Sequence, residues 1–360
     1  MTETVQPVDE ERMRAYSQRV FGMLNGAVMS AFIYLGDELG LFRALADGQP
    51  VTSEALAKRT GLSERWVREW LRGLGAAGIL DYAGDGHFAL SPEGRCVLAD
   101  DDHLACGVGL FTKLPRQMGT LDQIAESFRT GLGLPYDAFG SEGARGTERG
   151  LAPWYKHCLV PLALPVLDGV VAKLEQGAKV ADVGCGAGAA LIEMAKQYPK
   201  SDFHGYELSR HALERAEANK AEAGLTNLSF HDVQSDPLPD DGGFDFITTF
   251  DCLHDMTRPD KTLAAIYRAL RPDGSYLIAD INGAPTYEEN LARNPMTSLM
   301  YGFSVLSCMS SALSEPDGLG LGPLGFHEHV ARKMCAEAGF KRFERLDIPH
   351  AMNSYYEVRP

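Results

Sequence analysis

Three glycines at alternate positions follow a short apolar segment in the middle of the chain. Residues 179–183 have the composition of a buried strand, and Gly184, Gly186 and Gly188 come directly after them. Because glycine has no Cβ, this turn can be tight and a ligand can lie against its backbone. The periodic segment that follows predicts a helix, whose first N–H groups would point at that ligand.

An acidic residue follows at the spacing that nucleotide-binding βαβ units use. Glu207 lies nineteen residues after Gly188, at the end of a second predicted strand. In such units an acid about 20 residues past the glycines accepts hydrogen bonds from ribose hydroxyls. Gly184, Gly186 and Ala189 also fit the G-x-G-x-x-A pattern of dinucleotide sites, so the turn alone leaves the class of nucleotide open.

His254 is the candidate for proton chemistry. It stands four residues after the predicted strand 243–250. Ligands of open α/β sheets bind beyond the carboxyl ends of the strands, so this loop is expected to face the site. A near-neutral imidazole can take a proton from a hydroxyl group. Asp255 or another acid could orient the ring, and the alternative interpretation is a histidine that only shapes the pocket.

Two of these motifs resemble class I S-adenosyl-L-methionine (SAM)-dependent methyltransferases. The segment from Asp182 to Gly188 resembles their first motif, and Glu207 with the following Leu208 resembles their second. The turn at residues 270–274 (Leu-Arg-Pro-Asp-Gly), placed before an apolar strand, is frequent in these enzymes and favours SAM over NAD. The resemblance implies SAM as the cofactor and direct transfer of its methyl group, with most of the catalysis coming from positioning.

The residues around His254 indicate which class of methyltransferase the chain resembles. Leu253-His254-Asp255 is similar to the Leu-His-Asp motif of bacterial and plant small-molecule O-methyltransferases, in which the histidine is the general base. The implied function is methyl transfer to a small acceptor, at a hydroxyl oxygen. Two alternatives stay open: a SAM- or metabolite-responsive regulator that binds DNA, and a related enzyme that uses SAM without methyl transfer.

The resemblance also implies which residues hold the cofactor. The family usually binds the adenine amine with an aspartate five residues before a proline, and here that position is Gln234. A glutamine carbonyl can accept the same hydrogen bond, and Asp232 and Asp236 are alternatives. The expected cofactor-binding residues are Asp182, Gly184, Gly186, Gly188, Glu207, Leu208, Gln234, Ser235, Phe250 and Asp251.

Helices before the glycine turn and an insertion after the fifth strand are expected to cover the acceptor. The expected substrate residues are Trp154, Tyr155, His157, Met300 and Asn353. The alternative places Trp154 and Tyr155 in the core and His157 at the rim. His327 and His329 flank Glu328, but no third partner is specified, so no metal is expected.

We expect an α/β fold in three parts. These are a mainly helical winged-helix-like dimerisation domain (1–102), a helical connector over the active site (103–172), and a Rossmann-like methyltransferase domain with a seven-stranded sheet (173–360). The order helix, turn, helix, hairpin within residues 53–90 is that of a winged helix. Trp66 is expected on the buried face of its second helix, and residues 140–150 are expected to form a glycine-rich loop.

Composition restricts partners and compartment. The formal net charge is −15, and the arginines of the second winged-helix helix alternate with glutamates, so we expect no nucleic-acid partner. The seven cysteines form no C-x-x-C pair, which argues against a zinc or disulfide scaffold. Residues 1–10 lack a signal pattern, and no run of about 20 apolar residues is expected to cross a membrane. We therefore expect a cytoplasmic homodimer.

Overall fold

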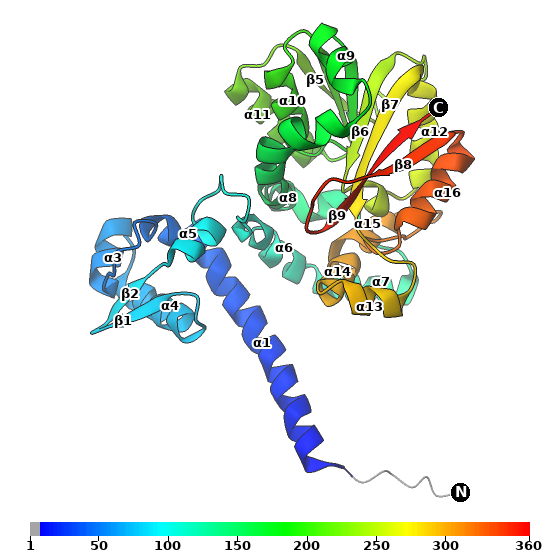
Figure 1. Cartoon of the computed structure of the whole chain (residues 1–360). Helices are drawn as coiled ribbons and strands as arrows, with labels where there is room; N and C mark the ends of the chain where they lie inside the picture. Colours follow the sequence, from blue (N-terminus) through cyan, green and yellow to red (C-terminus); the bar gives the residue numbers. More distant parts are fainter. Residues whose placement is uncertain (1–7) are drawn as a thin grey trace, which may run out of the picture. The chain divides into compact units, whose positions relative to one another are not determined.

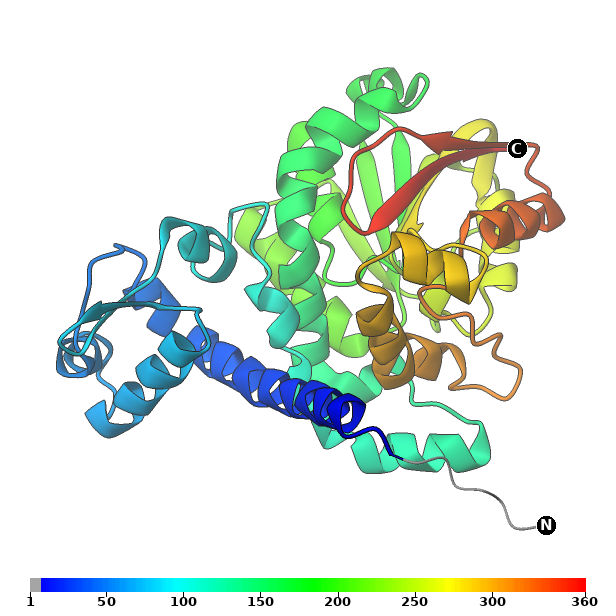
Figure 2. The ribbon, with the colours of Figure 1, turned by 60° about the horizontal axis from the view of Figure 1, so that its bottom comes forward.

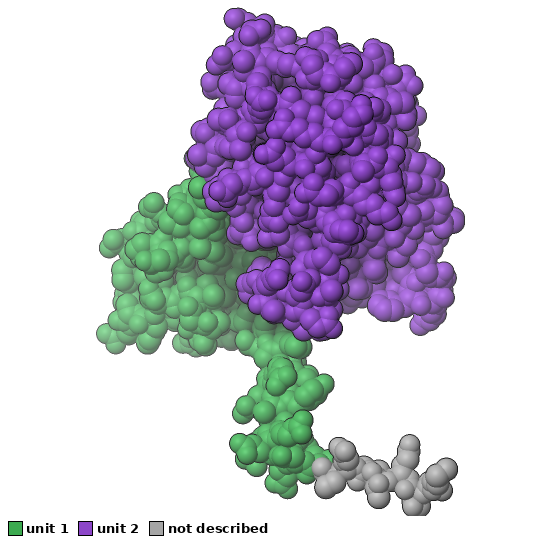
Figure 3. Space-filling view, turned by 45° about the vertical axis from the view of Figure 1, so that its right-hand side comes forward, with its two compact units in different colours: residues 1–114 green, residues 115–360 purple. Residues whose placement is uncertain are grey.

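The computed structural model describes residues 8–360, which divide into two compact units at residue 114 (Figures 1 and 3). Residues 1–7, which include part of the segment judged to lack a signal pattern, lie outside the described residues. Most of the expected connector belongs to the second unit. The elements of the first unit are α1 (Glu10–Glu38), α2 (Leu41–Ala44), α3 (Ser53–Thr60), α4 (Glu64–Ala76), β1 (Asp81–Gly84), β2 (His87–Ala89), α5 (Pro92–Leu98) and η1 (Val108–Phe111).

The first unit is built around a winged helix. Thr52 caps α3 by accepting a hydrogen bond from the Ala55 N–H, and Gly61 ends that helix in the left-handed conformation. The hairpin β1–β2 forms the wing. The core contains Trp70 of α4, whose indole N–H donates to the Phe32 carbonyl of α1 at 2.9 Å. Trp66 was wrongly expected in this core: its side chain is 79% exposed, because the buried stripe of α4 begins one position later.

Helix α1 extends beyond the rest of its unit (Figure 3). Residues 20–36 contain no charged side chain, and by length and composition α1 would be able to cross a membrane. The expectation that no apolar segment is long enough to cross a membrane was therefore wrong. The segment is not obvious in the sequence, because small residues stand between its larger apolar ones. Phe21 and Leu24 are 66% and 58% exposed, so the first unit by itself leaves much of the apolar face of α1 uncovered. The bent pair Tyr136–Val166 and Val170–Gln176 meets the same criteria only when it is counted as one span.

The second unit is a doubly wound α/β domain with a seven-stranded sheet in the order β5-β4-β3-β6-β7-β9-β8. All neighbours pair in parallel except at β9, which is antiparallel to both β7 and β8. The loops that follow β3, β4 and β6 therefore all lie at the carboxyl edge of the sheet. The strands are β3 (Lys179–Val183), β4 (Asp202–Glu207), β5 (Leu228–Asp232), β6 (Phe244–Phe250), β7 (Leu270–Ile281), β8 (Arg342–Leu346) and β9 (Asn353–Arg359).

Helices bury both faces of this sheet. One core joins α9, α10 and η3 to the strands, and the other joins α12 and α16 to the opposite face. Coverage of both faces explains why β3 and β6 are buried almost without interruption along their length, rather than at alternate positions. The packing elements are η3 (Tyr155–Ala163), η4 (Leu164–Val166), α9 (Val170–Gln176), α10 (Ala189–Gln197), α11 (Arg210–Ala223), η5 (Leu253–Asp255), α12 (Pro259–Ala269) and α16 (Glu328–Ala338).

Two helical segments complete the second unit. The expected loop over residues 140–150 is instead the first part of α8, which continues into the wide helical turns of η3 and runs along the sheet (Figure 2). Glycine is a poor helix former, but a Cβ at Gly143 would stand 2.8 Å from that of Phe139, so close packing outweighs propensity. The remaining elements are α6 (Leu114–Gly119), α7 (Leu121–Thr130), η2 (Tyr136–Phe139), α8 (Gly140–Trp154), α13 (Tyr287–Arg293), α14 (Thr297–Phe303), η6 (Ser304–Cys308) and α15 (Met309–Ala312).

Candidate active site

The glycine turn after β3 forms the floor of a cavity of about 440 Å³. Gly184, Gly186 and Gly188 all have positive φ, a conformation that glycine adopts without strain. A Cβ at Gly184 would meet the Cys252 thiol at 2.8 Å, and one at Gly188 would meet the Phe230 ring at 2.4 Å. No atom lies within 4 Å of the corresponding point at Gly186, which lines the cavity. The turn therefore leaves room for a ligand at its middle glycine.

Glu207 at the end of β4 ties this turn to the next loop. Its Oε2 accepts a hydrogen bond from the Gly186 N–H at 2.8 Å. Its Oε1 accepts from the N–H groups of Leu208 and Ser209 at 2.9 and 2.8 Å. Burial raises the pKa of the Glu207 carboxyl, although these three backbone hydrogen bonds oppose the effect. The carboxylate is thus fixed at the cavity wall, where it can accept hydrogen bonds from a nucleoside.

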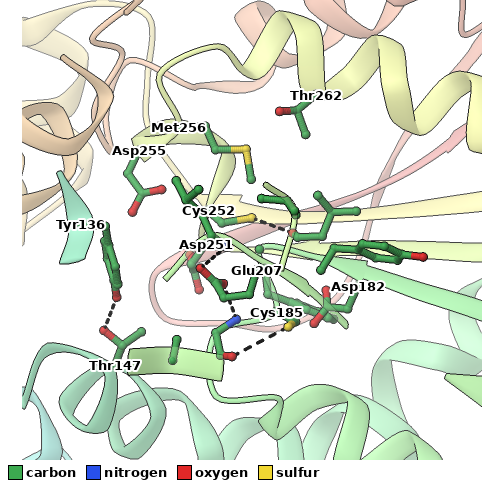
Figure 4. Close-up of a pocket in the computed structure, with 18 of the residues that line it drawn as sticks. Tyr136, Thr147, Asp182, Cys185, Glu207, Asp251, Cys252, Asp255, Met256 and Thr262 are labelled. Atoms are coloured by element: carbon green, nitrogen blue, oxygen red, sulfur yellow. Dashed lines mark hydrogen bonds between the residues drawn. The ribbon is translucent and has the colours of Figure 1, made fainter. Parts of the chain in front are cut away.

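Asp182 is a second buried carboxyl in the wall, at the end of β3. Burial raises its pKa to about 7, and the Thr248 hydroxyl, which donates to Oδ1 at 2.8 Å, opposes that rise. Figure 4 places Asp182 on one side of Glu207 and Tyr136 with Asp255 on the other. The Tyr136 and Thr147 hydroxyls are hydrogen-bonded at 3.0 Å and close the cavity from η2 and α8.

Not all expected cofactor residues line this cavity. Its wall includes the expected residues Asp182, Gly184, Gly186, Glu207, Leu208, Phe250 and Asp251. Gly188 instead caps α10, behind the turn. Near β5 the wall is made by Val233, whereas Gln234 and Ser235 are exposed beside it, and the Gln234 N–H is held by the Asp232 carboxylate at 2.9 Å. The assignment of Gln234 to the adenine stays a prediction.

His254 lies just beyond the cavity wall, in η5 between the wall residues Cys252 and Asp255. Its side chain is 4% exposed, and its Nδ1 is 2.6 Å from Oδ1 of Asp280, a buried residue near the end of β7. The same Oδ1 accepts from the Ile281 N–H at 2.7 Å. Burial lowers the pKa of His254, but the Asp280 charge outweighs it, with a smaller contribution from Cys308, and holds the pKa well above its usual range. Asp280 therefore fixes the orientation of the ring and favours its protonated form.

The expected substrate residues divide into two groups. Tyr155 lines the cavity, and Asn353 reaches its wall by donating from Nδ2 to Asp251 Oδ2 at 2.7 Å. Trp154, His157 and Met300 are outside the lining: Trp154 stacks on Tyr355 with ring centres 5.1 Å apart, His157 is exposed, and Met300 is buried in α14. Their contact with an acceptor stays a prediction.

Several residues in and behind the cavity wall were not anticipated. The sequence did contain a signal for Asp280, because this acid follows an apolar segment, residues 276–279, just as His254 follows the apolar strand 244–250. Tyr136 and Thr147 had none, since their place depends on how α8 packs. Met256 follows the histidine loop directly and also lines the cavity.

Comparisons with known proteins agree with this geometry. Residues 174–315 match the family "Methyltransferase domain", and residues 27–99 match "Rv2258c-like winged HTH domain". The demethylspheroidene O-methyltransferase of Cereibacter sphaeroides is 30% identical over 281 residues, which cover 74% of this chain and 71% of that protein. The indolepyruvate C-methyltransferase of Streptomyces griseus is 26% identical over 344 residues, 93% of each chain.

The solved structures share the fold over the whole length. Human N-acetylserotonin methyltransferase in complex with SAM is 18% identical, with a TM-score of 0.69, and the match covers 100% of this chain and 99% of the human chain. The cavity also has what SAM requires, an open backbone turn beside a fixed carboxylate. The chain belongs to the SAM-dependent methyltransferases that carry an N-terminal winged-helix domain, and SAM is its cofactor.

Proposed function

We propose that the protein methylates a hydroxyl oxygen of a small molecule, with His254 as the general base. The observation that carries this proposal is the contact of His254 Nδ1 with buried Asp280 at 2.6 Å. A neutral imidazole that donates from Nδ1 keeps a lone pair on Nε2. The proposal is supported by the loop position of His254, beyond the carboxyl end of β6 and between the wall residues Cys252 and Asp255.

In the proposed reaction the cofactor-binding residues and the His254–Asp280 pair have separate roles. When bound, SAM supplies an electrophilic methyl group. Gly184, Gly186 and Glu207 would hold it by backbone and carboxylate contacts. His254 removes the acceptor proton through Nε2 as the oxygen becomes nucleophilic, and Asp280 stabilises the imidazolium that results. Since the side chains around the cavity are mostly apolar, they exclude water from the reacting atoms.

The test is His254→Ala, with His329→Ala on α16 as the matched histidine control. SAM affinity is measured by calorimetry, and turnover with labelled SAM on a panel of phenols and hydroxylated aromatic acids. We expect unchanged SAM affinity and a fall in turnover of about 10²–10⁴-fold for His254→Ala, the range for loss of a general base. A variant with wild-type turnover would refute the proposed role of His254.

A second candidate is methyl transfer to carbon. It is favoured by the similarity, over 93% of each chain, to a protein named as a C-methyltransferase. The same base could remove a proton from a carbon next to a carbonyl group. Nuclear magnetic resonance of the product distinguishes the two, because a methyl group attached to oxygen resonates at much higher chemical shift than one attached to carbon.

We further propose that the protein is a cytoplasmic homodimer that pairs through the exposed apolar face of α1. Contiguous exposed apolar surface of this kind marks interaction sites. DNA is disfavoured as the partner, because Arg65 and Arg68 of α4 are each paired at 2.6 Å with a glutamate of the same helix. The cytoplasmic placement is supported by seven cysteines that are all reduced thiols.

A further inference from the structure

The loop that carries His254 meets the helical insertion after β7, and three side chains that can bind a metal come together there. Among residues 8–360, one group of histidine, cysteine and carboxylate side chains has its donor atoms within 4.8 Å of one another: His254, Asp255 and Cys308. The first two belong to η5 and the third to η6. Because 53 positions separate Asp255 from Cys308 in the sequence, the fold assembles the group and no local motif announces it.

The imidazole is already oriented as in a metal site. Nδ1 of His254 is engaged by Asp280, whose carboxylate is in turn held by the Ile281 N–H. Nε2 is the other ring nitrogen, and a metal would bind it in place of the hydrogen bond that His254 makes with Cys308. A carboxylate on the second nitrogen of a metal-binding histidine fixes the tautomer and strengthens the ligand. Asp280 thus plays the part of the carboxylate that supports a metal-binding histidine, and Asp255 and Cys308 supply the other two ligand atoms.

The three donors select the kind of cation. Imidazole nitrogen, thiolate sulfur and one carboxylate oxygen suit Zn²⁺, whereas Mg²⁺ and Ca²⁺ prefer oxygen ligands. In a tetrahedral zinc site the nitrogen and sulfur ligands are about 3.5 Å apart, given bonds of about 2.0 and 2.3 Å. Donors within 4.8 Å of one another therefore need shifts of only about 1 Å. Asp255 lines the cavity and Cys308 is half-buried, so a cation has a route to them.

We propose that Zn²⁺ binds between His254, Asp255 and Cys308 and inhibits methyl transfer. The thiol loses its proton on binding, and the fourth position remains for water. The cation would occupy Nε2, the lone pair that removes the acceptor proton. The inhibition therefore rests on the proposed function, whereas the binding does not. The methyl transfer proposed above uses no metal, so the site would regulate the enzyme.

Binding is tested on the full chain with Co²⁺ as a spectroscopic probe for Zn²⁺. Cobalt bound to a thiolate absorbs by charge transfer in the near ultraviolet, and zinc should displace it. We expect the band in the wild type and in Cys96→Ser, a control cysteine on α5, and its loss in Cys308→Ser. Asp280→Asn should weaken zinc binding about 10–100-fold, the usual effect of removing the outer partner of a histidine ligand.

The outcomes of these experiments test zinc binding separately from the proposed role of His254 as base. Equal cobalt spectra in the wild type and Cys308→Ser, with Asp255→Asn also unchanged, would overturn the site. A Cys308-dependent band together with zinc inhibition that Cys308→Ser relieves would support the whole proposal. A Cys308-dependent band with turnover unaffected by zinc would leave the site established, but would refute both the inhibition and the role of His254 as base.

Discussion

Asp280→Asn tests how the base is built, because the structure dictates which way the new amide must face. Oδ1 of Asp280 accepts from both His254 Nδ1 and the Ile281 N–H. An amide NH₂ group in that place would meet the Ile281 donor, so the oxygen must stay and the NH₂ must replace Oδ2. Oδ2 is buried without a hydrogen-bond partner. The variant should therefore keep the histidine tautomer, lose the charge, and lose about 1–3 kcal/mol of stability from the unpaired NH₂.

The effect on turnover follows from the lost charge. For charge centres about 4 Å apart and an effective dielectric constant of about 20, Asp280 stabilises the imidazolium by about 4 kcal/mol. Because the proton is about half transferred in the transition state, about 2 kcal/mol of this should appear in the barrier, or about 30-fold in kcat. That loss is smaller than the one expected for His254→Ala, in which the base itself is absent.

The assay is the pH profile of kcat/KM for the wild type and for Asp280→Asn. Asp280 holds the pKa of His254 above its usual range. Turnover in the wild type should therefore rise with pH as the imidazolium loses its proton, and this rising limb should move to lower pH in Asp280→Asn. The reasoning is refuted if the limb stays in place, or if Asp280→Asn is as slow as His254→Ala. Thermal unfolding of both variants separates a stability defect from a catalytic one.

Three further predictions concern the cofactor and the assembly. Glu207→Gln should weaken SAM binding about 10–100-fold by calorimetry, because an amide NH₂ would face one of the backbone N–H donors, such as that of Gly186, that its carboxylate accepts; an unchanged Kd contradicts this. Burial raises the pKa of Asp182 to about 7, so its contribution to stability is present below its unfolded pKa near 3.8 and is lost as pH rises toward 7. A cationic ligand favours the ionised form, so SAM affinity should rise through pH 7 and binding should release a proton. The heat of binding should therefore differ between buffers, and Asp182→Asn should abolish the effect. Phe21→Glu combined with Leu24→Glu should convert a dimer to monomer by light scattering, and a monomeric wild type would rule out the α1 interface.

Local patterns in the sequence were enough for the order of the elements and for the cofactor floor. The succession of strand, glycine turn, helix and acid depends on nearest neighbours along the chain. The structure places the Gly186 nitrogen 2.8 Å from Oε2 of Glu207. The seven-stranded sheet and the winged helix follow from the same kind of information, since burial on two faces and turn chemistry are visible in composition. The helix over residues 140–154 could not be predicted, because its glycines are tolerated only through packing against other segments.

What only the tertiary structure decided is which distant groups meet. The sequence by itself identified His254 and the kind of chemistry an imidazole performs. It left the partner of that histidine open between Asp255 and other acids, and the parallel pairing of β6 with β7 brings in Asp280. Cys308 likewise reaches His254 through the insertion that packs on η5. Parallel strands deliver their carboxyl ends to one edge, so residues far apart in the chain become neighbours there, and this proximity has no counterpart in local spacing.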